Sequence, residues 1–478
     1  MKILKYNINR LVALLLVVST VVSCSEDFLN EPVPTDQVSP DVIFGSRAGA
    51  DAFISGIMRN FRGQFLRDDS AGVNSIYYAR TVKGNDIIQG QTWFLFDYAN
   101  ENREPTYRRT RFTWNYCYYM INQANNLING ALASQDLSDI DKKEVVGQGR
   151  AIRAFFYFQL AMEFQHTYTY DSTLPAPPIY LELSLEGKPM STIDEMYQLI
   201  IEDLTYATEN LGEDRLAKSY INRNAAYGIL TRVYQTTHNW AGVEESARRA
   251  YGGGSPESVL STDYDNGFND ISNIEWIWGS AQSLDQSNYY WGAPYSHADH
   301  TVLSYAGTYF NNDFVNLFSV SDIRNLFSNH YGVPADDFRH NVTSKFTFNF
   351  DSDHPIIRTA EMLLAEAEGK YHNGDQAGAH DILFALQSNR DPLAVKSTNT
   401  GEALLAEILV ERRKELYAEI GVEWFDAKRY RKGITRTGNH RVLTPASLTP
   451  DDKRFILKVP QSELDANPNI DESVNQGR

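Results

Sequence analysis

The sequence predicts a mostly α-helical protein: a tetratricopeptide-like scaffold of helix pairs with an irregular, loop-rich inserted lobe that contains a few short strands. Apolar residues recur at the spacing of amphipathic helices through 193–251 and again through 356–390. The stretch between them, 252–354, is instead rich in Gly, Ser, Asn, Asp and aromatic residues. Stacked helix pairs of this kind bury one continuous core.

The predicted domain organisation follows these changes in pattern. It comprises a leader (1–23), a tether (24–40), an N-terminal helical region (41–251), the loop-rich lobe (252–354) and a C-terminal helical region (355–478). The leader begins with basic residues and continues with an apolar run of about a dozen residues, which is too short to span a bilayer. It ends in Val-Val-Ser directly before Cys24, which resembles a bacterial lipobox. We therefore expect cleavage before Cys24 and lipid on this residue, which anchors the chain to a membrane.

Periodic spacing places the helices of the N-terminal region. The predicted helices cover 46–61, 114–131, 141–164, 193–211, 226–234 and 240–251. Thr192 and Glu195 have the spacing of a capping box at the start of the fourth helix. Residues 77–109 have no sustained period, so we expect a long loop that could carry function. In the lobe, the short alternating stretch 274–278 predicts a strand.

The clearest helical pattern lies in 355–430. Its first apolar face comprises Ile356, Ala360, Leu363, Leu364, Ala367 and Tyr371. Gly374 suits the left-handed position after that helix, and Asp375 can cap the next one. A charged group further on comprises Glu411, Arg412, Arg413, Glu415 and Asp426. We interpret this group as ion pairs at helical spacing that join the last helices, and not as an active site.

These C-terminal residues resemble a known family. The stretches RTAEMLLAEAEGKYHNGDQAGAH (358–380) and ILVERRKELYAEIGVEWFDAKRYRKG (408–433) are similar to the C-terminal signature of the SusD/RagB family. CSEDFLNEPVPT, RAIRAFFYFQLAMEF and LKVPQSELDANPNI resemble further family segments, whereas 385–390 and 474–478 depart from the family pattern. The resemblance implies a surface-exposed outer-membrane lipoprotein of Bacteroidetes, without catalytic activity, that works with a SusC-type TonB-dependent transporter.

Composition and motifs exclude several functions. The formal net charge of −17 argues against nucleic acid as a partner. The sequence contains no Gly-rich phosphate loop, Gly-x-Ser-x-Gly elbow or Cys-x-x-Cys motif, and we expect neither a cofactor nor an enzyme. His297 and His300 lack further ligands at metal-binding spacing, so we expect no metal site. Cys117 lies on a helical apolar stripe and is expected to be a small buried residue.

The candidate ligand site lies on two aromatic loops, 84–103 and 286–309. In the relatives, an aromatic arc is built from loops over the helical frame. Aromatic ring faces stack on the C–H face of a sugar ring, and fixed polar groups bind its hydroxyls. The predicted glycan-binding residues are Trp93 and Trp291 as stacking platforms, Tyr289, Tyr290 and Tyr295 beside them, and Asp86, Asn102 and Arg103 as hydroxyl partners.

The preferred hypothesis is a non-catalytic glycan-binding lipoprotein on the cell surface, which delivers oligo- or polysaccharide to its transporter. The same scaffold could instead capture peptide or another nutrient, and the sequence does not separate these two ligands. A lipid-anchored glycosidase is a third hypothesis, because carboxylates are abundant although no pair stands out. A repeat-type adaptor that binds only protein is a fourth.

Overall fold

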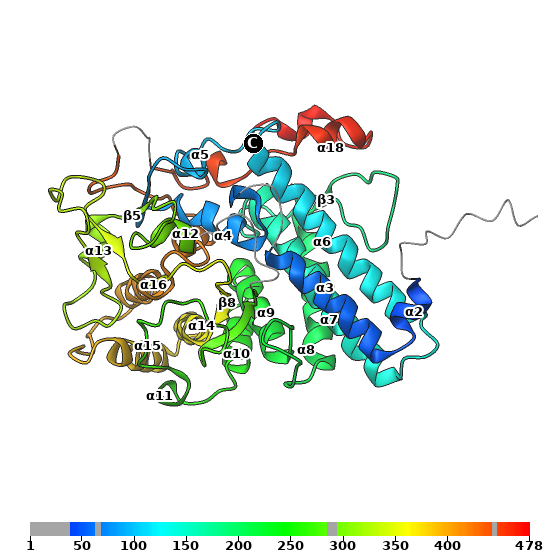
Figure 1. Ribbon diagram of the computed structural model, residues 1–478, viewed down its shortest axis with the longest axis horizontal. Coiled ribbons are helices and arrows are strands. Elements are labelled where there is room, and N and C mark those ends of the chain that lie inside the picture. The colour runs from blue at the N-terminus through cyan, green and yellow to red at the C-terminus, as the bar shows by residue number, and fades with distance from the viewer. Residues whose placement is uncertain (1–38, 63–67, 284–293, 442–446) are drawn as a thin grey trace, which may run out of the picture.

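Helices that pack on one another in sequence order form the frame of the protein (Figure 1). The computed structural model describes residues 39–62, 68–283, 294–441 and 447–478. The frame comprises α3 (Arg47–Arg62), α6 (Arg108–Ala133), α7 (Asp139–Phe164), α8 (Ile193–Asn210), α9 (Arg223–Thr237), α10 (Trp240–Ala250), α14 (Thr359–His372), α15 (Gln376–Arg390), α16 (Glu402–Leu416) and α17 (Val422–Arg429). Because α10 packs on α14, the helices before and after the lobe join into one stack. The predicted mostly α, tetratricopeptide-like scaffold is confirmed.

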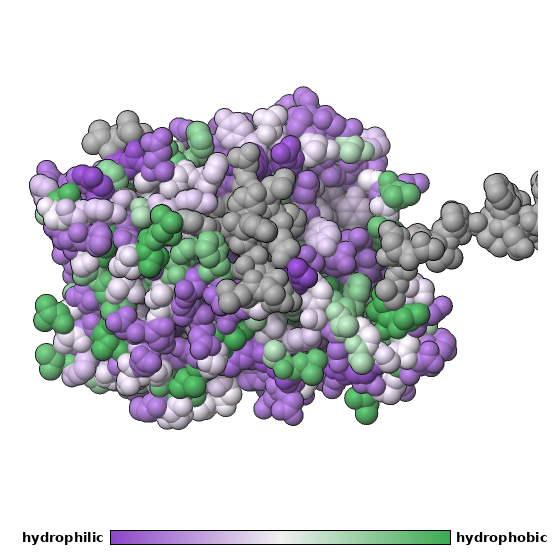
Figure 2. Space-filling model, viewed as in Figure 1, coloured by the Kyte–Doolittle hydropathy of each residue, from purple (hydrophilic) through white to green (hydrophobic). Residues whose placement is uncertain are grey.

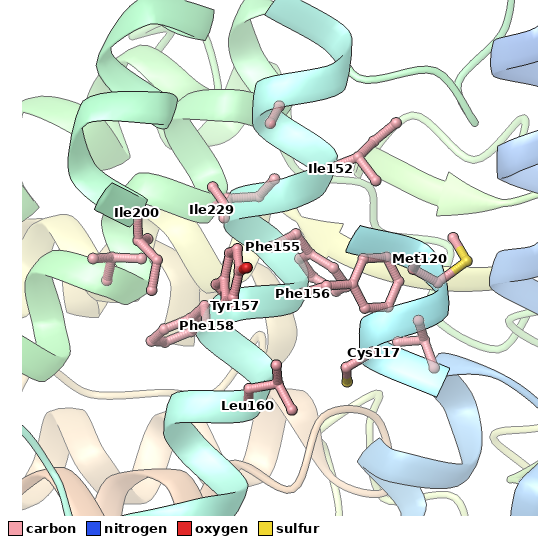
Figure 3. Packing of buried hydrophobic residues seen from close by; sticks show 14 of the residues in the cluster. Cys117, Met120, Ile152, Phe155, Phe156, Tyr157, Phe158, Leu160, Ile200 and Ile229 are labelled. Carbon is pink, nitrogen blue, oxygen red and sulfur yellow. The ribbon is translucent and has the colours of Figure 1, made fainter. Parts of the chain in front are cut away.

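Helix α7 lies at the centre of this frame and contacts α6 and α8 (Figure 3). Nearly every residue of its second half is buried, and its aromatic rings interlock with those of neighbouring elements. Phe156 meets Tyr116 of α6 edge-on at 5.5 Å between ring centroids. The backbones of α6 and α7 approach closely at Gly149, where a Cβ atom would lie 2.6 Å from a side-chain carbon of Ile128. Cys117 is also buried in this core, as predicted.

Local signals in the sequence locate the helix ends correctly. Thr192 and Glu195 form a complete capping box at the start of α8. Gly374 follows α14 with φ +91°, a conformation that strains residues with a side chain. Asp375 then accepts a hydrogen bond from the backbone N–H of Gly378 at 2.9 Å and so caps α15.

Two stretches differ from the prediction. Residues 355–358 belong to strand β8 (His354–Arg358) instead of a helix. Within the expected loop 77–109, the structure has helix α4 (Val73–Thr81), strand β1 (Ile87–Gln89) and the short helix α5 (Leu95–Tyr98). Seven consecutive residues of α4, from Ser75 to Thr81, are buried, so polar and apolar residues do not separate onto two faces. A helix enclosed on all sides therefore shows no amphipathic period.

The lobe is made of short elements joined by long connections, at the left of Figure 1. Its elements are α11 (Pro256–Val259), β4 (Trp276–Ser280), α12 (Tyr295–Ala298), β5 (Thr308–Phe310), α13 (Asn312–Val315), β6 (Phe327–Ser328) and β7 (Val342–Thr343). Outside the frame and lobe lie α2 (Pro40–Phe44), β2 (Pro175–Ala176), β3 (Ser191–Thr192) and α18 (Gln461–Ala466). The described strands form two-stranded antiparallel sheets, β1–β5, β2–β3, β4–β8 and β6–β7. The strand predicted over 274–278 is observed two residues later, as β4.

Buried ion pairs fasten the lobe to the frame. We define the central ion-pair cluster as Glu275, Arg324, Arg358, Arg390 and Glu415. The carboxylate of Glu415 accepts hydrogen bonds from all three guanidinium groups at 2.9–3.1 Å. Burial alone would raise the pKa of Glu415, but the three arginines hold this pKa well below its ordinary value.

The predicted structural role of the charged C-terminal group is confirmed, and two of its ion pairs, Glu411–Lys414 and Asp426–Arg429, have the predicted helical spacing. Other members of the group pair with distant residues. Arg412 of α16 pairs with Asp426 of α17 at 3.0 Å and joins the last two helices. Arg413 instead pairs with Asp86, far away in the sequence. These partners lie on different elements and not on successive turns of one helix. Over the described ranges, no helix is long and apolar enough to cross a membrane.

Candidate ligand-binding site

Strand pairing brings together the two segments that the sequence singled out. Strand β1 comes from the first segment and β5 from the second, and they pair antiparallel with Ile88 opposite Tyr309 and Gln89 opposite Thr308. The pairing extends beyond the strands, because the backbone N–H of Gly90 donates to the carbonyl of Gly307 at 2.6 Å. The chain that leaves β1 and the chain that enters β5 therefore lie side by side.

Glycine permits this close approach. A Cβ atom on Gly307 would lie 2.4 Å from the methyl group of Thr92 and 3.0 Å from the side-chain nitrogen of Gln89. Gln89 donates to the hydroxyl of Thr92 at 2.5 Å, which fixes the chain directly before Trp93. The position of Trp93 is therefore tied to the β1–β5 pairing.

Trp93, which follows strand β1, is an exposed aromatic residue with 39% of its area accessible. The guanidinium of Arg108 lies over its ring at 5.7 Å from the centroid. Arg108 is itself oriented by a bidentate ion pair with the buried carboxylate of Asp69. The indole is thus supported from within the protein while a large part of it faces solvent.

Tyr305 presents a second aromatic ring from the other segment. Its accessible fraction is 36%, and its ring centroid lies 5.2 Å from that of the buried His297. His297 in turn packs against Tyr78 and Phe94 at 5.2 and 5.3 Å. The backbone N–H of Tyr305 donates to the carbonyl of Ser296 at 2.7 Å, so both the backbone and the ring of Tyr305 are supported.

Further apolar side chains of the same two segments are also exposed. We define the β1–β5 surface as the exposed residues Trp93, Phe96, Val302, Leu303 and Tyr305. Supported aromatic rings exposed to solvent can stack on the apolar face of a sugar ring, and backbone and side-chain polar groups at the edge can bind its hydroxyls.

Several predicted site residues have structural roles instead. Tyr295 is 1% exposed, and its hydroxyl donates to backbone carbonyls, with Asp353 at 2.7 Å. Asp86 is buried and its carboxylate is held by the guanidinium of Arg413. Neither side chain faces solvent, because each completes an internal contact that the sequence alone does not reveal.

Asn102 and Arg103 also form internal contacts. The amide of Asn102 donates to the carboxylate of Asp97 at 3.0 Å and so fixes the turn after α5. Arg103 is buried and donates to the carbonyl of Ile456 at 3.0 Å. Tyr289, Tyr290 and Trp291 lie outside the described residues, as does Cys24.

Tyr305 and Phe96 were not among the predicted site residues. Tyr305 lies in the segment Ser-Tyr-Ala-Gly directly before β5, and a Gly that ends an aromatic loop next to a strand is the signal that could have selected it. Phe96 is 60% exposed on the short helix α5. A helix of four residues has no periodicity from which exposure could be inferred.

Glu423 lies next to the chain that enters β1, and the pKa of its carboxyl group is raised. Glu423 of α17 accepts hydrogen bonds from the backbone N–H groups of Asn85, at 2.6 Å, and Asp86, at 3.1 Å. Burial and then the nearby carboxylate of Asp86 raise the pKa of Glu423 to about 7, against the opposing effect of Arg413. Glu423 thus positions the chain that enters β1.

The histidines of this region are engaged in protein contacts. His300 lies between the hydroxyl of Tyr331, at 2.9 Å, and the carbonyl of Thr308, at 2.8 Å. Within the part of the chain that the structure describes, no group of three or more His, Cys, Asp or Glu residues is arranged to hold a metal ion.

Comparisons with known proteins point to one family. Residues 37–235 match a family model described as "Starch-binding associating with outer membrane", and residues 310–477 match the model of the "SusD family". A "SusD-like protein" of Bacteroides ovatus is 29% identical over 135 residues, which are 27% of this chain. This match spans only 22% of the length of the curated relative.

Solved structures match over nearly the whole chain. A SusD-like carbohydrate binding protein from Bacteroides vulgatus is 26% identical, with a TM-score of 0.80 over 89% of this chain and 98% of its own. A SusD superfamily protein from Bacteroides thetaiotaomicron is 24% identical, with a TM-score of 0.79 over 89% and 99%. The surface glycan-binding protein A from Bacteroides fluxus is 16% identical, with a TM-score of 0.69 over 89% and 97%. The last two similarities concern the fold alone.

Proposed function

This chain belongs to the SusD/RagB family, and from this premise we propose that it is a non-catalytic glycan-binding lipoprotein of the cell surface. It captures oligo- or polysaccharide and delivers it to a SusC-type TonB-dependent transporter in the outer membrane. The family is associated with the outer membrane and with carbohydrate binding. The glycan is bound at the β1–β5 surface.

The observation that carries this proposal is the pair of supported, solvent-exposed rings of Trp93 and Tyr305. These rings come from two segments more than 200 positions apart, which the β1–β5 pairing joins. A planar ring that is already held by its neighbours loses little conformational entropy on binding. Such rings suit neutral sugars, whose C–H faces stack on them without a need for opposite charge.

Affinity electrophoresis tests the glycan-binding site. The protein is run through gels that contain amylopectin, arabinoxylan, galactomannan or pectic galactan, and a glycan ligand retards it. Trp93→Ala should lose retardation, at a cost of ~2 kcal/mol or more of binding, as for other recognition hot spots. Tyr170→Ala is the matched control, because Tyr170 is equally exposed but packs on Arg431, away from the β1–β5 surface. Full retardation of Trp93→Ala would place the site elsewhere.

We propose that lipid on Cys24 anchors the protein at the surface of the outer membrane. The support is the leader that ends in Val-Val-Ser directly before Cys24. Cys24→Ala should leave the protein in the aqueous phase of a Triton X-114 partition or as uncleaved precursor, and protease treatment of intact cells should degrade the anchored protein. Normal processing and detergent partition of Cys24→Ala would contradict the anchor.

The transporter is proposed as a stable partner. Purification from membranes in mild detergent should recover an outer-membrane barrel of the SusC type together with this protein. Recovery of the protein alone from its native host, after repeated purification in different detergents, would contradict a stable complex.

The proposal excludes hydrolysis of the bound glycan. Near the β1–β5 surface, Asp86 is paired with Arg413, and the buried Asp97 is paired with Arg109 at 3.1 Å. Carboxylates held in such pairs are not free to act as general acid and nucleophile toward a glycosidic bond. Incubation with the retarding polysaccharide should release no new reducing ends. Release that persists in a repurified sample would identify an enzyme.

A further inference from the structure

We propose that a groove on helix α6, which shares no lining residue with the β1–β5 surface, is a second binding site for a neutral oligosaccharide. The groove has a volume of about 390 Å³, within the range of small-molecule sites. Its lining includes Trp114, Asn115, Tyr118, Tyr119, Asn122 and Tyr180. In Figure 2 the surface is hollowed beside the loop that follows β2.

The floor of this groove is one face of α6. Positions 115, 118, 119 and 122 have the spacing i, i+3, i+4 and i+7, so their side chains point to the same side of the helix. This face carries two tyrosines flanked by two asparagines, whereas α6 buries Cys117, Ile121 and Ala124 on its core-facing side. The rings of Tyr118 and Tyr180 meet edge-on at 5.8 Å, so aromatic groups line both the floor and one wall.

The wall is formed by residues 177–190, which are held in place along their length. The hydroxyl of Tyr118 donates to the carbonyl of Pro178 at 2.7 Å. The hydroxyl of Tyr157 donates to the carbonyl of Tyr180 at 2.8 Å and accepts from its backbone N–H at 2.7 Å. Asn467 donates to the carbonyl of Lys188 at 2.9 Å. A wall fixed by these bonds is already formed before a ligand arrives.

Helix α18 closes one end of the groove, and Figure 1 shows it above α6. The indole N–H of Trp114 donates to the carboxylate of Glu463 at 3.2 Å. The other oxygen of Glu463 accepts from Asn467 at 2.8 Å. The groove is therefore built from three segments that are distant in sequence and joined by side-chain hydrogen bonds.

Polar groups in the groove remain available for a ligand. Among the described residues, the side-chain amides of Asn115 and Asn122 have no hydrogen-bond partner. Tyr119 is 42% exposed and makes one long bond, in which its hydroxyl accepts from Asn60 at 3.3 Å. Each free amide can donate two hydrogen bonds and accept two, which suits adjacent hydroxyls of a sugar.

The charge of the lining selects the ligand class. The groove has no Lys or Arg in its lining, and its charged members are Glu182 and Glu463. The ammonium of Lys188 lies over the ring of Tyr180 at 5.4 Å from its centroid, but the two carboxylates of the lining disfavour an anionic ligand. A peptide that binds by strand addition would need a strand edge to pair with, and the groove is bounded by helices and a loop. Ring faces with free amides and carboxylates fit a neutral, polyhydroxylated chain.

The groove and the β1–β5 surface share no residue, so each can bind independently. Two sites on one chain strengthen the retention of a long polysaccharide through a high effective concentration, but they do not change the affinity of either site for a short fragment.

The test separates the two sites by substitution. The groove variant carries Tyr119→Ala at an exposed position and Asn122→Ala at a partly exposed one. Asn126→Ala is the control, because Asn126 is exposed on the same helix outside the groove. Four variants are compared: the groove variant, Asn126→Ala, Trp93→Ala, and Trp93→Ala combined with the groove substitutions. Each is run on the four polysaccharide gels and titrated calorimetrically with maltohexaose, xylohexaose, mannohexaose and galactohexaose. A melting curve for each variant verifies that it is folded.

Two hexasaccharide equivalents per chain in the unsubstituted protein, and one in the groove variant, would support the second site. Trp93→Ala should then retain a residual retardation that the groove substitutions remove. If Trp93→Ala alone abolishes all binding, or the groove variant binds as the unsubstituted protein does, the second site is overturned while the proposed function stands. If the groove substitutions abolish binding and Trp93→Ala does not, the groove is supported and the β1–β5 site is overturned. An absence of binding by the folded, unsubstituted protein to every glycan would contradict both.

Discussion

The helical frame and the loop-rich lobe are held together by different interactions. In the frame, helices such as α8 are specified by nearby residues, as the Thr192–Glu195 capping box and the stripe that follows it show. In the lobe, the backbone is held by distant carboxylates. Asp353 accepts from the N–H groups of Ile271 and Gln282, at 2.9 and 2.6 Å. The frame can therefore form from local pattern, whereas the lobe requires long-range pairing before its loops are fixed.

This difference matters for function, because three of the five residues of the β1–β5 surface belong to the lobe. Tyr305 precedes β5, and β5 is placed by pairing with β1 and by the lobe core around it. The site is thus sensitive to the interactions that fasten the lobe to the frame.

The largest expected effect follows removal of the charge at the centre of the ion-pair cluster. Glu415→Gln leaves Arg324, Arg358 and Arg390 buried without the carboxylate that joins them. Breaking a buried ion pair costs ~3–5 kcal/mol, and we expect a loss of this size in the free energy of unfolding, measured by urea titration. Hydrogen exchange should increase first in the lobe. Glu402→Gln, at an exposed position of the same helix, is the control. Equal stability of the two variants would contradict the fastening role of the cluster.

In the frame, loss of a local signal should have a smaller and more uniform effect. Thr192→Ala removes the hydroxyl that accepts from the N–H of Glu195 at 3.1 Å and should cost ~1 kcal/mol. The expected change is a lower unfolding midpoint with unchanged hydrogen exchange in the lobe. Thr205→Ala, at an exposed position of the same helix, should be nearly neutral. Faster hydrogen exchange confined to the lobe of Thr192→Ala would contradict the inference that this cap stabilises the frame alone.

The next prediction concerns the contribution of Glu423 to the free energy of unfolding, which depends on pH. Because the pKa of Glu423 is raised to about 7 in the folded protein, the folded state binds a proton more readily than the unfolded state. The stabilising contribution is fully present below the ordinary pKa of Glu and is lost as pH rises through about 7. Glu423 is partly exposed, so we expect a change of about 1 kcal/mol.

Glu423→Gln isolates this contribution from that of the histidines. Burial lowers the pKa of His166 and His372 to about 4, which makes stability rise with pH in the acid range and has the opposite sign. The difference in unfolding free energy between the two proteins, measured from pH 4 to 8, should therefore change between about pH 4.5 and pH 7. A difference that stays constant with pH would contradict the raised pKa.

The comparison also explains how far the sequence could predict the structure. Helical stripes and caps located α3, α6, α8 and α15, because each depends on residues within a few turns. The same rules missed α4, which is buried on all sides, and β8, whose hydrophobic residues were assigned to the adjoining helix. Burial on all sides removes the amphipathic period of α4. The buried apolar residues of β8 fit the period of the helix that follows and were therefore counted with it.

The site shows the same division. The sequence singled out the two segments that β1–β5 pairing joins, and its candidates included one exposed ring, Trp93. It could not distinguish Tyr305 from Tyr295, which lie ten positions apart in similar surroundings. Their difference comes from the fold: Tyr295 inserts into the lobe core and bonds to two backbone carbonyls, while Tyr305 remains on the surface.

The smallest effect on stability is expected at the β1–β5 surface itself. Trp93→Ala removes an exposed ring and its contact with Arg108, and should change the unfolding free energy by only about 0.5 kcal/mol. A loss of several kcal/mol, measured by urea titration, would identify Trp93 as a core residue.

The central claim is that Trp93 and Tyr305, from two distant segments, bind one glycan together. A double-mutant cycle tests it most directly: calorimetric titration of Trp93→Ala, Tyr305→Ala and the double variant with the oligosaccharide that matches the retarding polysaccharide. If both rings contact one ligand, each single variant should bind at least about tenfold more weakly, and the combined loss should differ from the sum of the single losses by 0.5 kcal/mol or more. Unchanged affinity in both folded single variants would contradict the claim.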